Sequence, residues 1–452
     1  MVPEAGWKYI ATKGRKTMKA MVLNGAHEHD PIGERVVSSV LAELEGRGWE
    51  VEHAVLREKK IANCQGDFFC WTRSPGLCMI DDDNRRLAAS IVQSDLLVYL
   101  TPVTFGGYSS YLKKAVDHQI QNILPFFAKV NGETHHAKRY ADYPAICAVG
   151  WADTPDVARD SVFHHLVWRN ALNMYAGSFT SGVVTAVDSD RVLRDKVRAL
   201  VEQARGGATQ KRVELPFMPA PEDTSVSIKQ ALFLVGSPRR AKSTSNSLGS
   251  YLMAKLEASG IKTETVYVYD MLGTDDKKAA LIDAVKRADL IVLAFPLYVD
   301  SLPAPVIACL ETIAAASFTG LEAKFFVPLV NCGFPEAAHN NPALAVCREF
   351  SRETGFIWAG SLSLGSGEGL VRGVPLDKLG GPAMLIMKVL DEAGKRLASG
   401  LTIPTSLQKN WDKPVIPGWL YRTIGAFGWR AMAKQWKAEK RLKARPYENS
   451  LA

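Results

Sequence analysis

Long apolar runs are missing from this sequence. No stretch approaches the roughly 20 uncharged apolar residues that a membrane-spanning helix requires. The segment from Met1 to Thr17 contains basic residues but lacks the apolar centre of a secretion signal. We therefore expect neither a membrane-spanning nor a secreted protein.

Regularly spaced cysteine pairs are missing as well. Seven cysteines at irregular spacing in 452 residues do not form a disulfide framework. Free thiols indicate a reducing compartment, and we expect a cytoplasmic location. With 47% hydrophobic and 23% charged residues, the chain has the composition of an ordinary globular protein with more than one core.

What the sequence contains instead is a β/α alternation that occurs twice. Short apolar runs alternate with amphipathic helical patterns. Strands that are apolar on both faces are typical of parallel sheets covered by helices on both sides. Right-handed crossovers then predict a doubly wound, five-stranded α/β sheet in each copy. The predicted strands are 19–25, 50–56, 95–103, 145–151 and 178–187 in the first copy, and 230–236, 263–269, 289–297, 325–332 and 356–364 in the second.

The two copies also match residue by residue. Residues 94–102 (SDLLVYLTP) align with residues 288–296 (ADLIVLAFP), and each run is the third strand of its copy. The segment between the copies is polar and contains Gly-Gly and Pro-Ala-Pro, which is typical of a linker. The predicted organisation is an N-terminal extension (1–17), a first domain with a cysteine-bearing insertion (18–205), a linker (206–228), a second domain (229–400) and a basic aromatic tail (401–452).

A phosphate-binding loop is predicted in the second copy. In open α/β sheets, ligands bind beyond the carboxyl ends of the strands. Residues 236–246 (GSPRRAKSTSN) follow the first strand there and lead directly into a helical run. The loop offers hydroxyls, Arg side chains and the N–H groups of a helix N-terminus, all of which suit a mononucleotide phosphate. Helix capping alone would explain part of the pattern. The predicted phosphate ligands are Ser237, Arg239, Ser243, Thr244, Ser245 and Asn246.

A ring-binding loop is predicted after the third strand of the first copy, where residues 101–110 read TPVTFGGYSS. Two glycines let the backbone approach a planar heterocycle, while Phe105 and Tyr108 offer faces or edges to stack on it. In the second copy the same place carries an aromatic residue, and by its position we expect the loop after the fourth strand to complete the wall of the site. The predicted ring contacts are Thr101, Pro102, Thr104, Phe105, Gly106, Gly107 and Tyr108, and in the second copy Pro296, Leu297, Tyr298, Asn331, Cys332 and Gly333.

On these residues the chain resembles the flavodoxin-like NAD(P)H-dependent FMN reductases, and its first half is similar to the branch that includes iron–sulfur flavoproteins. The Gly-Ser-Pro-Arg loop with Ser243 and Ser245 matches the family's FMN-phosphate loop, and residues 101–107 match its flavin-ring loop. The resemblance covers most of residues 18–400. It implies two tandem flavodoxin-like domains, noncovalent FMN, NAD(P)H as electron donor, quinones, nitroaromatics or free flavin as acceptors, and frequent homodimers.

The first copy departs from the family at its own phosphate loop. Residues 24–30 read NGAHEHD, with acidic residues where the family has hydroxyl and basic ones. Carboxylates repel a phosphate dianion, so we expect this pocket to bind FMN weakly or not at all and favour the second copy as the flavin site. The glycine-rich run 365–369 follows the last strand of its copy and is therefore not predicted to bind a dinucleotide.

The inserted cysteine segment reads CQGDFFCW over residues 64–71 and continues to Cys78. Iron–sulfur flavoproteins have a compact four-cysteine motif in this region, because a cubane cluster takes four thiolates. Here Asp67 stands in one of the four places. Cys147 is a candidate to complete the set in space, a point that the sequence leaves open. We favour a structural or redox-active thiol loop and predict no metal site.

The sequence predicts an FMN-dependent NAD(P)H oxidoreductase that passes electrons to a small acceptor, with no evident catalytic acid or base. One alternative is a flavodoxin-type electron carrier. Such carriers are usually acidic, whereas this chain has a formal net charge of +8. The other alternative is a flavin-free scaffold that uses its basic tail to bind a membrane or a partner.

The tail carries most of the net charge. The segment from Trp419 to Ala452 contains eight Lys or Arg residues and two Glu, which accounts for +6 of the chain's +8. With Trp429 and Trp436 interleaved, the tail suits either a solvated helix whose tryptophans dock on the protein or a peripheral contact with an acidic membrane surface. We expect a small-molecule acceptor and no nucleic acid as partners, and leave a homodimer open.

Overall fold

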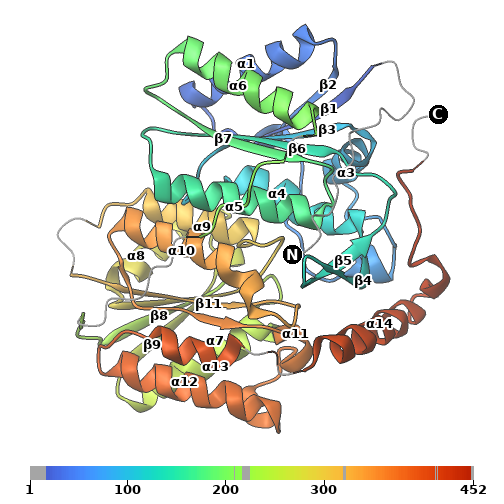
Figure 1. Ribbon diagram of the computed structural model, residues 1–452. Coiled ribbons are helices and arrows are strands. Elements are labelled where there is room, and N and C mark those ends of the chain that lie inside the picture. The colour runs from blue at the N-terminus through green and yellow to red at the C-terminus, as the bar shows by residue number, and fades with distance from the viewer. Residues whose placement is uncertain are drawn as a thin grey trace. The chain divides into compact units, whose positions relative to one another are not determined.

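The computed structural model describes residues 17–207, 209–215, 224–318, 322–412, 414 and 416–448. These residues fall into two compact units (Figure 1). Unit 1 comprises the described residues between 17 and 215 together with 422–448, and unit 2 comprises those between 224 and 421. The structure thus divides the predicted tail, since residues 401–421 belong to unit 2 and residues 422–448 belong to unit 1.

Unit 1 is built on a five-stranded sheet with the order β2-β1-β3-β6-β7, in which every neighbouring pair is parallel. This is the doubly wound arrangement that the sequence predicts, and all five expected strands are present. Its central strands are buried on both faces, as the uninterrupted apolar runs require. The strands are β1 (Lys19–Asn24), β2 (Glu50–Val55), β3 (Leu96–Pro102), β6 (Ala145–Ala152) and β7 (Phe179–Thr185).

Helices cover both faces of this sheet (Figure 1). Apolar residues of α1 and α6 form one buried cluster with β1, β3 and β6. The helices α3, α4 and α5 lie on the opposite face, as a doubly wound sheet demands. The helices are α1 (Pro31–Gly46), α2 (Phe69–Thr72), α3 (Asp83–Gln93), α4 (Ser110–Asp117), α5 (Val157–Asn173) and α6 (Asp190–Arg205).

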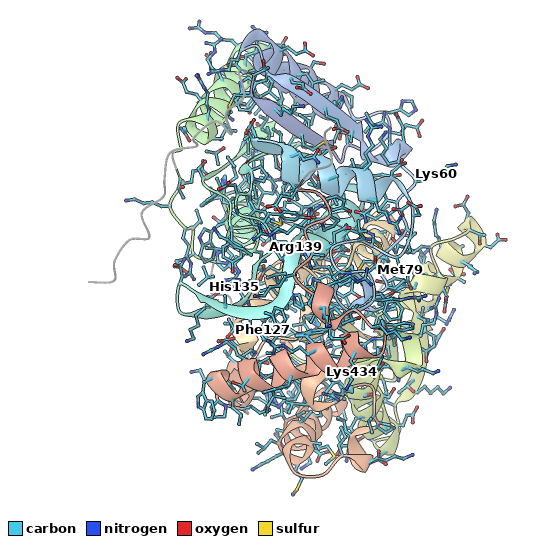
Figure 2. All side chains as sticks on the ribbon, turned by 90° about the vertical axis from the view of Figure 1, so that its right-hand side faces the viewer. Lys60, Met79, Phe127, His135, Arg139 and Lys434 are labelled. Carbon is cyan, nitrogen blue, oxygen red and sulfur yellow. The ribbon has the colours of Figure 1, made fainter. Side chains whose placement is uncertain are left out.

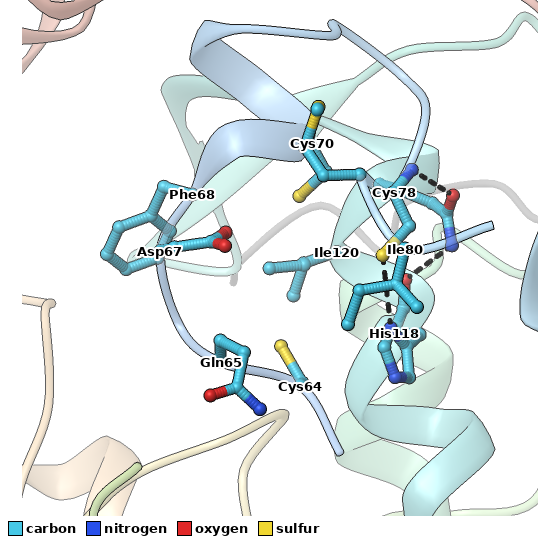
Figure 3. Close-up of a pocket in the computed structure, with 11 residues that line it drawn as sticks. Cys64, Gln65, Asp67, Phe68, Cys70, Cys78, Ile80, His118 and Ile120 are labelled. Atoms are coloured by element: carbon cyan, nitrogen blue, oxygen red, sulfur yellow. Dashed lines mark hydrogen bonds between the residues drawn. The ribbon is translucent and has the colours of Figure 1, made fainter. Parts of the chain in front are cut away.

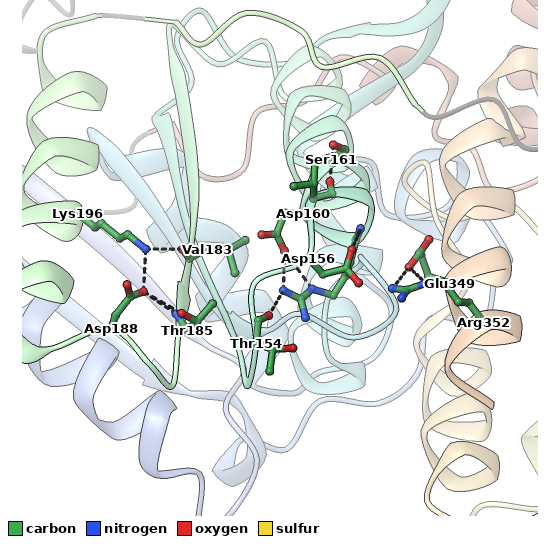
Figure 4. Close-up of polar contacts among 12 residues, drawn as sticks. Thr154, Asp156, Asp160, Ser161, Val183, Thr185, Asp188, Lys196, Glu349 and Arg352 are labelled. Carbon is green, nitrogen blue, oxygen red and sulfur yellow. Dashed lines mark hydrogen bonds and ion pairs between the residues drawn. The ribbon is translucent and has the colours of Figure 1, made fainter. Parts of the chain in front are cut away.

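Short polar side chains begin these helices and hold the turns before them. Asp156 caps α5 by accepting a hydrogen bond from the N–H of Arg159 at 3.0 Å (Figure 4). In the turn between β7 and α6, Asp188 accepts from the N–H of Thr185 and from Lys196 Nζ. Such local bonds fix where each helix leaves the sheet edge.

A two-stranded antiparallel hairpin in unit 1 is absent from the sequence prediction. It consists of β4 (Ile123–Val130) and β5 (Glu133–Lys138), joined by Asn131 and Gly132, which both have positive φ. An Asn-Gly pair between two β-rich runs is the sequence signal of such a turn, so the hairpin was readable from the sequence.

Residues 422–448 are fastened to the hairpin side of unit 1. The buried guanidinium of Arg139 donates hydrogen bonds to the carbonyls of Leu442 at 3.2 Å and Ala444 at 2.6 Å. Tyr447 is buried as well, and its hydroxyl contacts Gln121 Oε1 at 3.1 Å. This end of the chain is therefore part of the core of unit 1 and not an appendage.

Unit 2 repeats the arrangement with the strand order β12-β11-β10-β8-β9 and with β13 also paired to β11, all in parallel. The predicted fifth strand is split in two around Gly360, which has a φ of +97°. A Cβ at Gly360 would lie 2.4 Å from the carbonyl oxygen of Ile403, so the close approach requires glycine. The strands are β8 (Gln230–Val235), β9 (Lys262–Tyr267), β10 (Leu290–Pro296), β11 (Phe325–Asn331), β12 (Ile357–Trp358) and β13 (Leu362–Leu364).

The sheet of unit 2 also has helices on both faces. Residues of α7 and α12 share one buried cluster with β8, β10 and β11, while α8, α9 and α10 lie on the other face (Figure 1). None of the helices in the described ranges combines the length and the apolar character needed to cross a membrane. The helices are α7 (Thr244–Ala258), α8 (Asp275–Arg287), α9 (Ala304–Ala314), α10 (Asn341–Thr354), α11 (Gly367–Leu370), α12 (Pro382–Ala398), α13 (Thr405–Asp412) and α14 (Gly418–Lys434), whose residues from 422 onward belong to unit 1.

Candidate functional site

The loop between β8 and α7 lies at the carboxyl edge of the sheet in unit 2, where the sequence places the phosphate site. A Cβ at Gly236 would lie 2.6 Å from Val306 Cγ2, so glycine is needed where the loop leaves the strand. Ser243 caps α7, and its Oγ accepts a hydrogen bond from the N–H of Asn246 at 3.1 Å. The capping role that the sequence allowed for is therefore real for Ser243.

The first turn of α7 keeps donors for a ligand. The backbone N–H groups of Thr244 and Ser245 donate to no residue in the described parts of the chain. Amide groups of this kind at a helix N-terminus, together with the helix dipole, favour an anion. Ser237, Ser243, Thr244 and Ser245 are all buried at this edge.

The two arginines of the loop face different carboxylates. Arg239 donates to Glu368 in a bidentate pair, with Nη1 at 2.8 Å from Oε1 and Nη2 at 2.6 Å from Oε2. Thr244 Oγ1 adds a third bond to Glu368 Oε2 at 3.2 Å. Arg240 is paired with Asp270 on the exposed side of the loop. The Glu368 carboxylate is thus held between the guanidinium of Arg239 and the first residue of α7.

The loops after β10 and β11 meet the phosphate loop. Asn331 Nδ2 donates to Ser245 Oγ at 2.9 Å and to the carbonyl of Phe295 at 3.2 Å. Pro296 is the register partner of Asn331, and the N–H of Leu297 donates to the Asn331 carbonyl at 2.8 Å. The structure therefore brings together three loops that the sequence predicts separately.

The aromatic and thiol groups of these loops differ in exposure. Tyr298 is half-buried and forms a tight turn with Ser301, in which Val299 and Asp300 both have positive φ. Cys332 is buried, and burial raises the pKa of its thiol to about 12. Cys332 is therefore protonated and unreactive at neutral pH, while Gly333 beside it is exposed.

A later segment of unit 2 lies against the phosphate loop. A Cβ at Gly373 would lie 2.1 Å from the carbonyl oxygen of Lys242, so the segment after α11 touches the loop directly. Tyr421 donates its hydroxyl hydrogen to the carbonyl of Gly333 and lies close to Gly369. The glycine-rich run 365–369, which the sequence excludes as a dinucleotide fingerprint, thus carries Glu368 to Arg239.

In unit 1 the aromatic side chains of the predicted ring-binding loop are buried. Phe105 and Tyr108 are only 3% and 1% exposed, so neither ring offers a face to a ligand. The Tyr108 hydroxyl bonds to Asn170 Oδ1 at 3.1 Å, and its ring meets Phe163 edge to face. The burial of both rings does not support the stacking role expected of them, and for Tyr108 the covering residues include Phe163 of α5.

The backbone of the same loop is nevertheless held at the sheet edge. Thr101 Oγ1 accepts a hydrogen bond from the N–H of Ser109, and Ser109 Oγ donates to the carbonyl of Gly25, which ties the loop to the end of β1. Thr104 and Gly107 pair with each other across the turn. Pro102 and Thr104 are half-buried, whereas Gly106 and Gly107 are buried. Any ring contact here falls to backbone groups and not to aromatic faces.

The loop between β1 and α1, which corresponds to the phosphate loop of unit 2, ends in an acidic helix cap. Asp30 caps α1 by accepting from the N–H of Gly33 at 2.8 Å and also accepts from Trp151 Nε1 at 2.7 Å. Pro31 at the start of α1 has no N–H to offer. A carboxylate and a residue without an N–H thus stand at this helix N-terminus, and weak phosphate binding by unit 1 stays a prediction.

The inserted segment of unit 1 encloses a small cavity of about 30 Å³ (Figure 3). Three cysteines and Asp67 surround it, and Figure 3 shows the Asp67 carboxylate and the sulfurs of Cys64 and Cys78 directed toward the same space. Cys78 Sγ also lies 3.9 Å from His118 Nδ1. Residues far apart in the insertion thus converge on one place.

Burial keeps these thiols protonated. It raises the pKa of Cys64 to about 12 and the pKa of Cys70 well above its usual range. The pKa of Cys78 is raised by the same cause to a smaller extent. All seven cysteines of the chain are free of disulfide bonds. Without a bound cation, the cavity therefore holds neutral thiols that react slowly.

The side chains around the cavity suit an iron–sulfur cluster better than a single metal ion. Within the described residues, no three His, Cys, Asp or Glu side chains stand close enough to share one metal ion. An iron–sulfur cluster instead binds each thiolate at a separate iron, and the cavity offers three thiols and one carboxylate at separate corners. Cys147 is buried in β6 and does not line the cavity, so it completes no such set.

The geometry defines a tandem α/β protein with ligand loops at the carboxyl edges of two doubly wound sheets. Residues 18–186 match the family model described as NADPH-dependent FMN reductase, and residues 229–335 match the model described as flavodoxin-like fold. The chain is thus a tandem flavodoxin-like protein, and the greater part of its first unit is similar to the NADPH-dependent FMN reductases.

Two curated relatives, both described as iron-sulfur flavoprotein and both from Archaeoglobus fulgidus, resemble part of this chain. One is 28% identical over 103 residues, which is 23% of this chain and 46% of the relative. The other is 34% identical over 84 residues, which is 19% of this chain and 42% of the relative. The chain thus spans less than half the length of each of these relatives.

Solved structures resemble one portion of the chain at a time. An NAD(P)H:quinone oxidoreductase from Methanothermobacter marburgensis is 15% identical with a TM-score of 0.29, covering 38% of this chain and 96% of that protein. The apo form of an NADH:FMN oxidoreductase is 21% identical with a TM-score of 0.32, covering 40% and 94%.

Proposed function

We propose that this protein is an FMN-dependent NAD(P)H oxidoreductase that passes electrons to a small acceptor such as a quinone, a nitroaromatic or free flavin. The observation that carries the proposal is the match of residues 18–186 to the NADPH-dependent FMN reductase model. The convergence of the predicted phosphate and ring loops in unit 2 supports it, because such loops are where an open α/β sheet binds a nucleotide.

We place the FMN phosphate at the N-terminus of α7. Arg239 and the Thr244 hydroxyl would bind its oxygens in the position now held by Glu368, and the N–H groups of Thr244 and Ser245 would add neutral donors. Asn331 fixes Ser245 relative to the neighbouring loops and so keeps the site in shape. Bound FMN supplies the hydride and electron chemistry, and the protein's task is to position it and leave one ring face open.

The visible spectrum of the purified full-length protein tests the proposal. We expect flavin absorption, restored by added FMN if it is lost, and oxidation of NADPH or NADH with menadione as acceptor. A colourless protein that takes up no FMN would overturn the proposal and favour the flavin-free scaffold. A protein that binds FMN but turns over no nicotinamide would favour the electron carrier.

The proposal includes the cellular location, the assembly and the membrane contact of the protein. Seven free cysteines fit a reducing cytoplasm. The acceptor is a small molecule, and a homodimer of the kind frequent among the resembling reductases is the proposed assembly. A peripheral membrane contact through residues 422–448 is also part of the proposal, because side chains there remain apolar and exposed.

The cysteine cavity favours a second candidate function for unit 1, which is binding of an iron–sulfur cluster. Cys64, Cys70 and Cys78 would supply thiolates, and the Asp67 carboxylate would be the fourth ligand. A cluster there would supply one-electron transfer. The competing hypothesis from the sequence, a metal-free thiol loop, uses the same residues.

Iron and acid-labile sulfide content of protein prepared without oxygen separates these two hypotheses. A cluster predicts both elements in the wild type, loss of both in Cys70→Ser, and their retention in Cys147→Ser, which alters a buried thiol outside the cavity. If the wild-type protein contains neither element, even after anaerobic reconstitution, the cluster hypothesis is wrong and the metal-free thiol loop is favoured.

A further inference from the structure

The part of α14 that belongs to unit 1 is anchored by one face. A Cβ at Gly425 would lie 2.6 Å from Phe127 Cε2, which shows how closely the helix approaches the β4–β5 hairpin. The Trp429 ring meets Phe68 and Trp71 edge to face, with centroid separations of 5.3 and 5.2 Å. Ala433 is fully buried. The inner face of the helix is therefore covered by other residues of unit 1.

The opposite face is apolar and exposed. Ile424 and Phe427 are 54% and 67% exposed, and Ala431 follows at the next turn. Spacings of three and four residues place these three side chains on one side of the helix. Met432, near their edge, is also exposed. A helix that lies on a protein in water normally turns polar side chains outward, so this stripe requires an explanation.

Positively charged side chains follow the stripe along the chain. The first of them, Lys434, is the last residue of α14 (Figure 2). None of the five exposed cations that follow the stripe forms an ion pair with a residue in the described ranges, whereas Arg445 further along is paired with Glu448. These five are Lys434, Lys437, Lys440, Arg441 and Lys443.

We propose that the outer face of α14, formed by Ile424, Phe427 and Ala431 with Met432 at its edge, docks on an anionic membrane surface with the following cations at the lipid headgroups. A helix lying in the interface buries such an apolar stripe, and basic residues near the surface are attracted to anionic lipids. The packed inner face holds the helix on unit 1. The apolar stripe can therefore meet a membrane without breaking any of the contacts of that inner face.

Charge argues against two other occupants. A second copy of this chain would bring an equally basic surface against the first, and like charges repel. Nucleic acid would satisfy the cations but would leave Ile424 and Phe427 in water, because phosphates need no apolar stripe. An anionic bilayer satisfies both the charge and the apolar side chains.

The proposal rests on the membrane contact within the proposed function but needs neither flavin nor turnover. Full-length protein is sedimented with vesicles of phosphatidylcholine alone or with phosphatidylglycerol added. We expect binding to the anionic vesicles only, weakened by salt, and a loss of about tenfold in affinity for Ile424→Ser/Phe427→Ser. Val157→Ser, which removes an 85% exposed apolar side chain elsewhere on unit 1, is the matched control and should bind as the wild type does.

Equal binding of both vesicle types, or an Ile424→Ser/Phe427→Ser variant that binds like wild type, would overturn the proposal. So would a concentration-dependent dimer that the same variant abolishes, because the stripe would then be a contact between copies. Turnover of NADPH with a water-soluble quinone is measured separately without vesicles. Loss of that turnover would count against the proposed function alone.

Discussion

Glu368 reaches Arg239 across 129 residues of sequence and holds its guanidinium in a bidentate pair. The same carboxylate accepts a bond from Thr244 at the N-terminus of α7. An arginine fork, a hydroxyl and a helix N-terminus are the groups that proteins use for phosphate. In the proposed site, Glu368 would therefore compete with the phosphate of FMN for these groups.

Replacing Glu368 by Gln should strengthen FMN binding. The change removes the negative charge that occupies the site while keeping the size of the side chain. Because a hydrogen bond between charged groups contributes roughly 1.5–3 kcal/mol, we expect the Kd for FMN to fall by about tenfold or more. Titration of the apoprotein by quenching of flavin fluorescence measures it. Asp377→Asn removes an exposed charge in the same segment and should leave the Kd unchanged.

The adjacent arginines should differ in their effects on FMN. Arg239 faces the site, so Arg239→Ala should raise the Kd for FMN by about 10- to 100-fold. Arg240 is paired with the exposed carboxylate of Asp270, and Arg240→Ala should change the Kd by less than about threefold. If both variants lose FMN equally, or neither does, the phosphate has been assigned to the wrong place.

Gly373→Ala should destabilise unit 2 by more than the cost of placing alanine at a positive φ. Gly373 and Gly355 have nearly equal φ values of +74° and +73°, but a Cβ at Gly355 meets nothing within 4 Å. Gly355→Ala should therefore cost only the conformational term, about 1 kcal/mol. Gly373→Ala must also push Lys242 and the phosphate loop aside, and we expect at least about twice that loss. Urea denaturation of both variants gives the comparison.

Alkaline pH should destabilise the folded protein through its buried thiols. Burial raises the pKa of Cys64, Cys309 and Cys332 to about 12, whereas an unfolded thiol titrates near 9.0. The folded state therefore holds more protons above pH 9, and the stability that the neutral thiols contribute is lost as the pH rises from about 9 to 12. Urea denaturation under reducing conditions across this range should show a falling free energy of unfolding, with a shallower fall in Cys309→Ala.

Trp429→Ala should open the cysteine segment. Trp429 packs against Phe68, which lines the cavity, and against Trp71 of α2, so its removal leaves a gap over α2. We expect a lower melting temperature and severalfold faster alkylation of Cys70, which is read by mass spectrometry of labelled peptides. Trp419→Ala removes an indole that is 64% exposed and should alter neither quantity. Unchanged labelling in Trp429→Ala would show that the helix does not protect the thiols.

The sequence predicted the fold well because parallel strands buried on both faces leave an unmistakable apolar signature. Every predicted strand exists within one or two residues, apart from the split at Gly360, where contact with Ile403 requires a break. The β4–β5 hairpin was missed although its Asn131-Gly132 turn is a local signal. Residues 422–448 were predicted as part of a separate tail because their docking on Arg139 depends on partners about 300 residues away.

The candidate site was predictable only where its chemistry is local. The phosphate loop is a contiguous stretch, so its hydroxyls and arginines were readable in order. Nothing in the sequence couples Arg239 to Glu368, and the same holds for Asp30 and Trp151 in unit 1. Phe105 and Tyr108 were assigned to a ligand because the pattern around Gly106 does not reveal that the folded chain buries both rings.

The attachment of Arg139 to the carbonyls of Leu442 and Ala444 has a consequence for biosynthesis. The ribosome makes the second sheet before it makes residues 422–448, the strap that completes the first unit. Until translation has passed residue 444, Arg139 therefore keeps its bonds to Ile123 but lacks the two carbonyl acceptors of the strap. Severing the gene at the midpoint would therefore yield an amino-terminal fragment that lacks part of its own interior, whereas supplying the strap as a separate peptide should restore it.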